Sequence, residues 1–270
     1  MKTYSDITIH HPFSSSVQKE KYLLSYNGQY YEASHAIVEL VEELQRYEEE
    51  KAAIEAYVRK KEGKYTPEQV REVIEKFIDP IFRAVPKKRS FLYEKELFSA
   101  GAIDRFSDTF RFLFHKAYMM VVLVGMLALD AWFFFTTSDL LLFNNKVNIY
   151  MVAGLLVFML ASSFFHELGH ASACKYFGVR HGGIGFGLYL NFPVLYTDVT
   201  EVWKLNRAQR CVVNLAGVYF QSYWLIALLV AFLITGNDIL RYLILIMNLG
   251  FVMTLNPFFK FDGYWIASDL

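Results

Sequence analysis

The sequence has few of the residues that mark several large classes of protein. It contains only two cysteines, Cys174 and Cys211, and both lie in or beside apolar segments, which excludes a disulfide-stabilised secreted scaffold. Its 27 basic and 27 acidic side chains cancel, so the net charge gives no sign of a nucleic-acid partner. Charged residues make up only 20% of the chain, whereas hydrophobic residues make up 54%. This balance indicates a membrane protein.

The first 21 residues lack the apolar stretch of a cleavable signal peptide, and the chain has no internal repeat or low-complexity tract. We therefore expect the N-terminal part to stay on the cytoplasmic side of the membrane. The charged side chains are also unevenly spread, because residues 1–90 hold 30 of the 54. A charged, soluble module is thus expected to precede an apolar one.

Residues 1–83 carry the local signals of a small α+β domain. In the stretch 21–33, two β-prone runs flank the dipeptide Asn27-Gly28. This dipeptide between such runs is the strongest short signal for a two-residue hairpin turn. The domain is therefore expected to contain a β-hairpin.

Helical patterns follow the hairpin. Apolar residues recur at helical spacing after Ser34, which is suited to cap the start of a helix. A second helix is expected over 48–63 and a third over 66–78, and Asp79-Pro80 should end the third. A hairpin with three short helices predicts a winged-helix-like domain.

Residues 84–116 are expected to connect this domain to a membrane domain over 117–270. The connection contains an apolar stripe with charged residues from Asp104 to Arg111 beside it, which predicts an interfacial helix leading into the membrane. Packing of this helix on the soluble domain is the alternative. The stripe consists of Ile103, Phe106, Phe110, Leu113 and Phe114.

Four apolar segments, each near the ~20 residues that a spanning helix needs, predict a mainly α, polytopic membrane bundle of about four transmembrane helices. The segments are 117–135, 149–177, 211–234 and 239–256. Basic residues gather before the first segment and between the second and third, whereas the other two loops carry only Lys146 and Arg241. The positive-inside rule then places the N-terminal domain and the loop 178–210 in the cytoplasm of a multi-pass cell-membrane protein.

The second segment ends in SSFFHELGHASACKYF (162–177), which places three ionisable side chains in one apolar helix. His166 and His170 are one helical turn apart, about 6 Å along the axis, so both imidazoles can bind one Zn²⁺. Glu167 points about 100° away, where it can move a proton between water and a leaving group. This spacing predicts a zinc hydrolase site. The alternative is a set of polar residues at the level of the lipid headgroups.

Two histidines leave zinc short of one protein ligand. Cys174 lies on the same face but about 9 Å further along the axis, so it is interpreted as a packing residue. Asp262, in NPFFKFDGYW (256–265), follows a helix break at Asn256-Pro257, and the expected topology brings it to the same side as the histidines. Asp262 is therefore the favoured third ligand. The other candidates are His115, Asp130, His181 and Asp198.

The motifs HELGH and NPFFKFDGYW resemble those of the site-2 protease family of intramembrane zinc metalloproteases, over most of the expected membrane domain. The resemblance implies that His166, His170 and Asp262 bind zinc. It also implies that Glu167 is the general base and that Asn256 helps to hold the substrate or its oxyanion.

Two further stretches carry a weaker likeness. The run 214–221 is similar to a helix of that family, with Val218 where proline is usual and Gln221 near a usual asparagine. Hydrogen bonds between helices explain Asn214 and Gln221 equally well. The glycine-rich stretch 181–203 resembles a loop of the subgroup found beside ribosomally made, modified peptides. It could present an edge strand to an extended substrate, and a flexible loop is the alternative.

The N-terminal domain is similar in pattern to the domains that recognise precursor peptides in those pathways. The resemblance as a whole implies a membrane zinc endopeptidase of the epipeptide type, whose partners are a modified ribosomal precursor peptide and the lipid bilayer. The family commonly has further transmembrane segments after the Asp-Gly motif. Because this chain ends eight residues past Asp262, we expect a truncated or unusually minimal member.

Two other functions are compatible with parts of the sequence. One is a non-catalytic membrane protein for peptide binding, export or immunity, with a relic metal site. The other is a metal transporter, which would need polar residues through several helices, whereas the first and fourth segments carry few.

Overall fold

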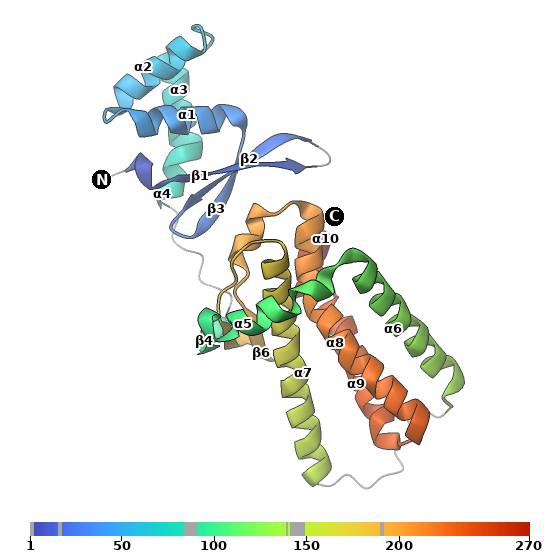
Figure 1. Cartoon of the computed structure of the whole chain (residues 1–270). Coiled ribbons are helices and arrows are strands. Elements are labelled where there is room, and N and C mark those ends of the chain that lie inside the picture. The colour runs from blue at the N-terminus through green and yellow to red at the C-terminus, as the bar shows by residue number, and fades with distance from the viewer. Residues whose placement is uncertain (1–2, 16–17, 84–90, 139, 141–148, 190–191) are drawn as a thin grey trace. The chain divides into compact units, whose positions relative to one another are not determined.

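The chain divides into two compact units, Met1–Arg89 and Ser90–Leu270, shown in Figure 1. The structure, a computed structural model, describes residues 3–15, 18–83, 91–138, 140, 149–189 and 192–270. Residues 84–90 of the predicted connection and the loop 141–148, with Lys146, lie outside the described residues.

The first unit contains a three-stranded antiparallel sheet in the order β1 (Thr8–Ser15), β2 (Gln18–Tyr26), β3 (Gln29–Ala33). The predicted hairpin is confirmed, because β2 and β3 pair across a turn at Asn27-Gly28. These two residues have φ angles of 48° and 73°, and a type I′ turn needs positive φ at both positions. Strand β1 was not predicted, since its sequence does not alternate clearly.

Helices α1 (His35–Arg46), α2 (Glu50–Lys60) and α3 (Pro67–Val73) follow the sheet. The predicted N-caps are confirmed: the Ser34 hydroxyl accepts a hydrogen bond from the backbone of the first helical turn, and Thr66 caps α3. The core of the unit draws on the sheet and on every one of these helices. It includes Leu24, Val41, Ile54 and Val70.

The prediction that Asp79-Pro80 ends the third helix is wrong. Helix α3 runs into a wider π-helical turn over Ile74–Ile78 and then into α4, Asp79–Arg83. Within the π turn the Asp79 N–H donates to the Ile74 carbonyl, five residues back. Pro80 follows this wider turn directly, as the second residue of α4. The unit is a small α+β fold, and its finer description as a winged helix remains a prediction.

The second unit is mainly helical. Within the described residues, three helices are long and apolar enough to cross a membrane: α6 (Lys116–Thr136), α7 (Ile149–Tyr176) and α8 (Arg207–Thr235). Helix α9 (Asp238–Thr254) covers the fourth predicted segment, but with 17 residues it is shorter than the ~20 that a span needs. The presence of apolar spans is thus supported, and a count of four remains a prediction.

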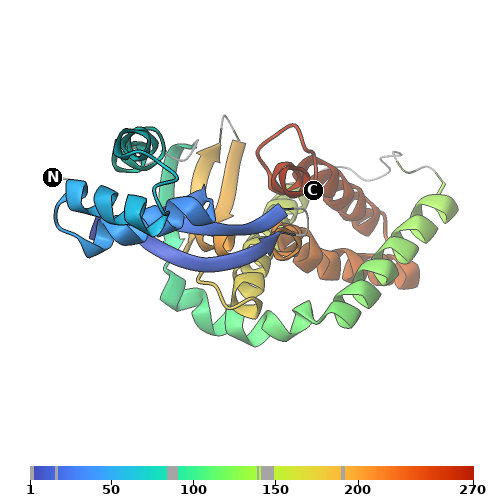
Figure 2. The same ribbon diagram turned by 90° about the horizontal axis from the view of Figure 1, so that it is seen from above.

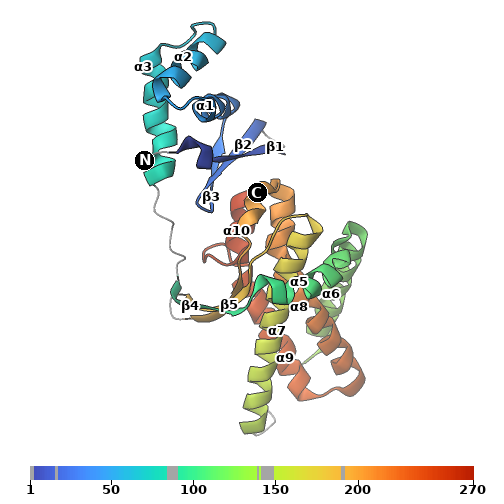
Figure 3. The same cartoon turned by 60° about the vertical axis from the view of Figure 1, so that its left-hand side comes forward.

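Helix α8 is the centre of the second unit. It packs against α6, α7, α9 and the short C-terminal helix α10 (Asp262–Asp269), as Figures 1 and 3 show. Helices α7 and α8 approach closely at Gly169, where an added Cβ would collide with the Ala216 carbonyl oxygen and the Phe220 ring. The absent side chain of Gly169 therefore brings the histidine-bearing turn of α7 directly against α8.

A second antiparallel sheet has the order β4 (Phe91–Phe98), β5 (Ile184–Tyr189), β6 (Phe192–Thr197). Figure 2 shows β5 and β6 side by side, and β6 packs against α7. The prediction of β structure in the glycine-rich loop is confirmed. Strand β4 was not predicted, because it pairs with residues nearly a hundred positions away.

Helix α5 (Ala100–Phe110) and the following 3₁₀ turn, Arg111–Phe114, carry the apolar stripe of the predicted connection. They belong to the second unit, and α5 lies across α7 in Figure 1. Ile103 is buried beside Ala171 of α7, whereas Phe106 is 58% exposed. Part of the stripe, including Ile103, therefore packs on the second unit. A position of its exposed residues, such as Phe106, at the membrane interface remains a prediction.

Replacing Gly169 with leucine should destabilise the second unit, because the new side chain would meet the backbone of α8. Overpacking of this kind costs about 1–3 kcal/mol, so the apparent Tm of the protein in detergent should fall by several degrees. Gly154→Leu on the same helix is the matched control, since an added Cβ there has no heavy atom within 4 Å. Equal Tm values for the two variants would contradict the close approach.

Candidate metal centre

Two histidines of α7 and an aspartate of α10 converge on one point. The His166 Nε2 atom lies 3.1 Å from His170 Nε2 and 3.1 Å from Asp262 Oδ2, and His170 Nε2 lies 3.4 Å from Asp262 Oδ2. In a tetrahedral zinc site with bonds of ~2.0–2.1 Å, neighbouring ligand atoms are about 3.3 Å apart. The three atoms thus have the spacing of three corners of such a tetrahedron.

The hydrogen bonds behind the histidines determine where their protons lie. His170 Nδ1 is 2.8 Å from the Val213 carbonyl oxygen, which can only accept, so Nδ1 donates. His166 Nδ1 is 3.1 Å from Gln221 Oε1. The amide group of Gln221 donates to Ser162 Oγ over 3.0 Å, which turns its oxygen towards the histidine. When both imidazoles are neutral, each Nε2 atom therefore carries a lone pair that points towards Asp262 Oδ2 and the other Nε2 atom.

The carboxylate of Asp262 completes a set of acceptors with no donor between them. Its Oδ2 atom is buried without a hydrogen-bond partner among the described residues. Three such acceptors repel one another unless a cation lies between them, and two imidazoles with one carboxylate are a common zinc donor set. The residues therefore fit a zinc ion.

The turn between α9 and α10 places Asp262 at the first position of α10. Gly263 follows it, and a Cβ there would collide with the carbonyl group of Leu255 at the end of α9. Asn256 accepts the Phe258 N–H over 2.9 Å through its side-chain oxygen, so its side chain shapes this turn. A role for Asn256 in substrate binding remains a prediction.

Glu167 lies on α7 beside the convergent groups. Its side chain is not one of the three that meet, and its carboxylate is within electrostatic range of the His170 ring. It is buried, and its backbone carbonyl accepts a hydrogen bond of 3.1 Å from Thr197, the last residue of β6. Glu167 thus lies beside the ligand set, and its role in proton transfer remains a prediction.

Three of the alternative third ligands are not part of this cluster. Asp130 accepts a hydrogen bond of 2.9 Å from Asn248 of α9, and Asp198 accepts one of 3.1 Å from the Thr200 backbone. His115 is exposed just before α6. Within the part of the chain that the structure describes, the two histidines and Asp262 form the one cluster with metal-ligand spacing.

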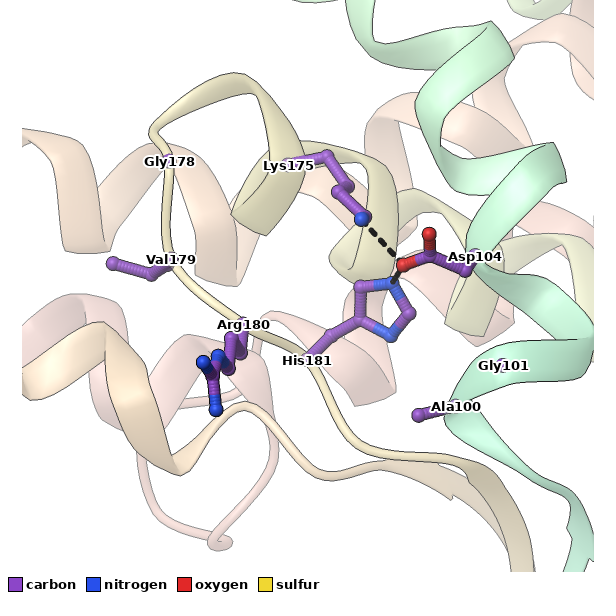
Figure 4. Close-up of a pocket in the computed structure, with 8 residues that line it drawn as sticks. All are labelled: Ala100, Gly101, Asp104, Lys175, Gly178, Val179, Arg180 and His181. Atoms are coloured by element: carbon purple, nitrogen blue, oxygen red, sulfur yellow. Dashed lines mark ion pairs between the residues drawn. The ribbon is translucent and has the colours of Figure 1, made fainter.

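The fourth alternative, His181, lines a cavity of about 450 Å³ between the start of α5 and the end of α7. Its Nε2 atom lies 3.0 Å from Ser107 Oγ and 3.5 Å from Asp104 Oδ1, and Lys175 pairs with the same carboxylate. Figure 4 shows His181, Asp104 and Lys175 directed towards one another. None of the three convergent ligands lines this cavity, so His181 connects α5 to the loop after α7.

Two residues of α8 support the site. The interpretation of Gln221 as a partner in hydrogen bonds between helices is confirmed, because its amide bonds to His166 and Ser162 of α7. Gln221 orients His166, and the signal for it was a polar side chain in the middle of an apolar run. Gly217 leaves space for the His166 ring, because an added Cβ would collide with that ring. Nothing in the local sequence distinguishes this glycine from one that merely allows helix packing.

Replacing Gln221 with leucine should weaken zinc binding by about 10- to 100-fold, because the His166 ring loses the acceptor that orients it. Competition against a chelator, on purified protein in detergent, measures the affinity. Gln209→Leu is the control: Gln209 lies on the same helix and takes part only in the capping box at its start. If Gln221→Leu binds zinc as tightly as Gln209→Leu, the orienting role is wrong.

No protein-family model matches the chain, and no solved structure matches it. Over 125 residues the chain is 29% identical to a protein of Bacillus subtilis (strain 168) named "Putative peptide zinc metalloprotease protein YydH". The alignment covers 41% of this chain and 49% of that protein, so the chain spans about half the length of the relative it matches. The similarity agrees with a zinc-dependent peptidase.

Proposed function

We propose that the chain is a membrane-embedded zinc endopeptidase that cleaves a peptide bond with Glu167 as general base. The observation that carries the proposal is the convergence of His166, His170 and Asp262 at zinc spacing, directly beside Glu167. The name of the distant relative supports the same metal and the same class of reaction.

Each residue of the site has a distinct part in the proposed hydrolysis. A zinc ion held by the three ligands would polarise a peptide carbonyl and lower the pKa of a water molecule towards ~7. Glu167 takes a proton from the attacking water as its oxygen bonds to the carbonyl carbon. It then delivers that proton to the amine as the C–N bond breaks. Because Glu167 and His170 are buried, these charges act at short range with little screening.

The depth of the site supports cleavage near one edge of the bilayer. His166 is 17 positions after Ile149, so it lies about 26 Å along α7. The hydrocarbon core of a bilayer is about 30 Å thick. If α7 begins at one surface of that core, the histidines lie near the opposite surface, which the distribution of basic residues predicts to be cytoplasmic.

The second sheet supports an extended peptide as substrate. Strand β6 is an edge strand of its sheet, and its last residue, Thr197, hydrogen-bonds the backbone of Glu167. A peptide that added to this edge would be led towards the ligand set, with main-chain hydrogen bonds supplying the affinity.

The family resemblance extends the proposal to the whole chain. We assign it to the site-2 protease type, with about four spans over 117–270 and a cytoplasmic recognition domain over 1–83. The substrate is then a modified ribosomal precursor peptide, as in epipeptide pathways. The hairpin of β2 and β3 in the first unit supports a peptide-binding edge, because winged-helix recognition domains bind along their hairpin.

Replacing Glu167 with glutamine should leave zinc bound but reduce cleavage at least 100-fold, because the side chain can no longer accept a proton. Mass spectrometry of a co-expressed precursor peptide, with metal analysis of the purified variant, measures both properties. A variant that binds zinc and still processes the peptide normally would exclude Glu167 as the base. A non-catalytic peptide-binding or immunity protein would keep its activity in cells.

Replacing Asp262 with alanine should reduce the zinc content of the purified protein from about one ion per chain to a small fraction, because one of three protein ligands is lost. Asp198→Ala is the control, since that carboxylate was a candidate ligand and is instead engaged by Thr200. Full zinc content in Asp262→Ala would place the third ligand elsewhere.

A further inference from the structure

A buried ion pair joins the start of α8 to the end of α10. Arg210 donates to Asp269 through Nη2 over 2.6 Å and through Nε over 2.9 Å, and both side chains are buried. The remaining Arg210 nitrogen, Nη1, donates to the Leu205 carbonyl over 3.2 Å, and the guanidinium stacks on the Trp203 ring. The arginine is thus held on every side, and its two-pronged contact with Asp269 allows little movement of α10.

Stability alone is a poor explanation for this pair. Removing two charges from water costs more than their attraction returns in many proteins, and an apolar contact of similar size would often be more stabilising. The helix dipoles add to the cost, because Arg210 lies in the first turn of α8 and Asp269 in the last turn of α10. Because the pair is costly in these two ways, we explain it by its effect on structure: it fixes the position of α10 against α8.

Helix α10 connects this pair to the candidate metal centre. Asp262 and Asp269 are seven residues apart, which is two helical turns, so they share a face and lie about 10 Å apart along the axis. Of the eight residues of α10, Gly263 alone is fully buried. Trp265 adds an edge-on contact with Trp203, and the contacts at the two ends of α10 help to fix its position.

The same face of α8 supports all three convergent groups. Arg210, Val213, Gly217 and Gln221 follow one another at spacings of three, four and four residues and therefore form a single stripe. The Val213 carbonyl and the Gln221 amide orient the two histidines, and Gly217 leaves space for one ring. Arg210 is the member of this stripe that faces α10.

We propose that Arg210 and Asp269 are positioning residues for the third metal ligand: their ion pair holds α10 so that Asp262 stays within reach of the two histidines. The inference rests on the proposed zinc function and goes beyond it, because neither residue contacts the metal-facing atoms. Helix α8 then contributes no ligand but sets the position of every ligand.

Zinc affinity tests this inference directly. The full chain carrying Asp269→Asn or Arg210→Gln is purified in detergent, and its affinity for zinc is measured by competition with a chelator. Each variant should bind about 10- to 100-fold more weakly, as removal of groups that orient ligands usually does. The double variant should be no weaker than either single variant, because the two residues act as one unit. Cobalt substitution should show a weakened tetrahedral absorption spectrum in all three.

A second arginine–aspartate pair, formed within α9 and away from the three ligands, provides the control. Asp238 pairs with the buried Arg241 over 3.1 Å on α9, and Asp238→Asn should leave the zinc affinity unchanged. If Asp269→Asn fails to fold, Asp269→Glu decides the question, because it keeps the charge and lengthens the side chain by one methylene. A folded Asp269→Glu protein with weakened zinc binding supports the inference.

Two failures can be told apart. Wild-type zinc affinity in folded Asp269 and Arg210 variants would overturn the positioning role and leave the metal site in place. A wild-type protein that does not bind zinc, or a His166→Ala variant that binds it equally well, would overturn the proposed function itself.

Discussion

The second unit depends on one electrostatic constraint, the meeting of three hydrogen-bond acceptors in a buried place. Hydrogen bonds to Val213 and Gln221 fix the protons of the two imidazoles on the far side of each ring, so the near nitrogens and the Asp262 oxygen face one another as lone pairs. Such an arrangement is unfavourable in a medium of low dielectric without a cation. The surrounding helices therefore have to hold the groups together against their mutual repulsion.

Several features of the unit follow from this requirement. Gly169 lets α7 lie directly on α8, and Gly217 leaves space for the ring of His166. The turn after α9 returns the chain to the histidines, where α10 begins with Asp262. The first half of α7 is exposed and apolar all round, as a helix in lipid would be, whereas the turns that carry the site are enclosed by protein. Ionisable groups enclosed by protein on a helix that is otherwise apolar are typical of a functional site in a membrane protein.

Much of this arrangement could be predicted from local sequence. The hairpin turn at Asn27-Gly28 and the pairing of two histidines one turn apart depend only on neighbouring residues, and both are as expected. Cys174 is fully buried in an apolar cluster, as its interpretation as a packing residue predicted. The remaining features depend on how distant segments meet. Strand β4 pairs with a strand far away in the sequence, so no local signal predicts it. The roles of Gln221 and Arg210 depend on how α8 packs against α7 and α10, which local sequence does not reveal.

X-ray absorption at the zinc edge on the purified protein tests the central claim most directly, because it reports the atoms around the metal. The account predicts one zinc ion per chain with nitrogen and oxygen neighbours at ~2.0–2.1 Å and a clear imidazole signature. A sulfur neighbour at ~2.3 Å, or the absence of any imidazole contribution, would contradict it.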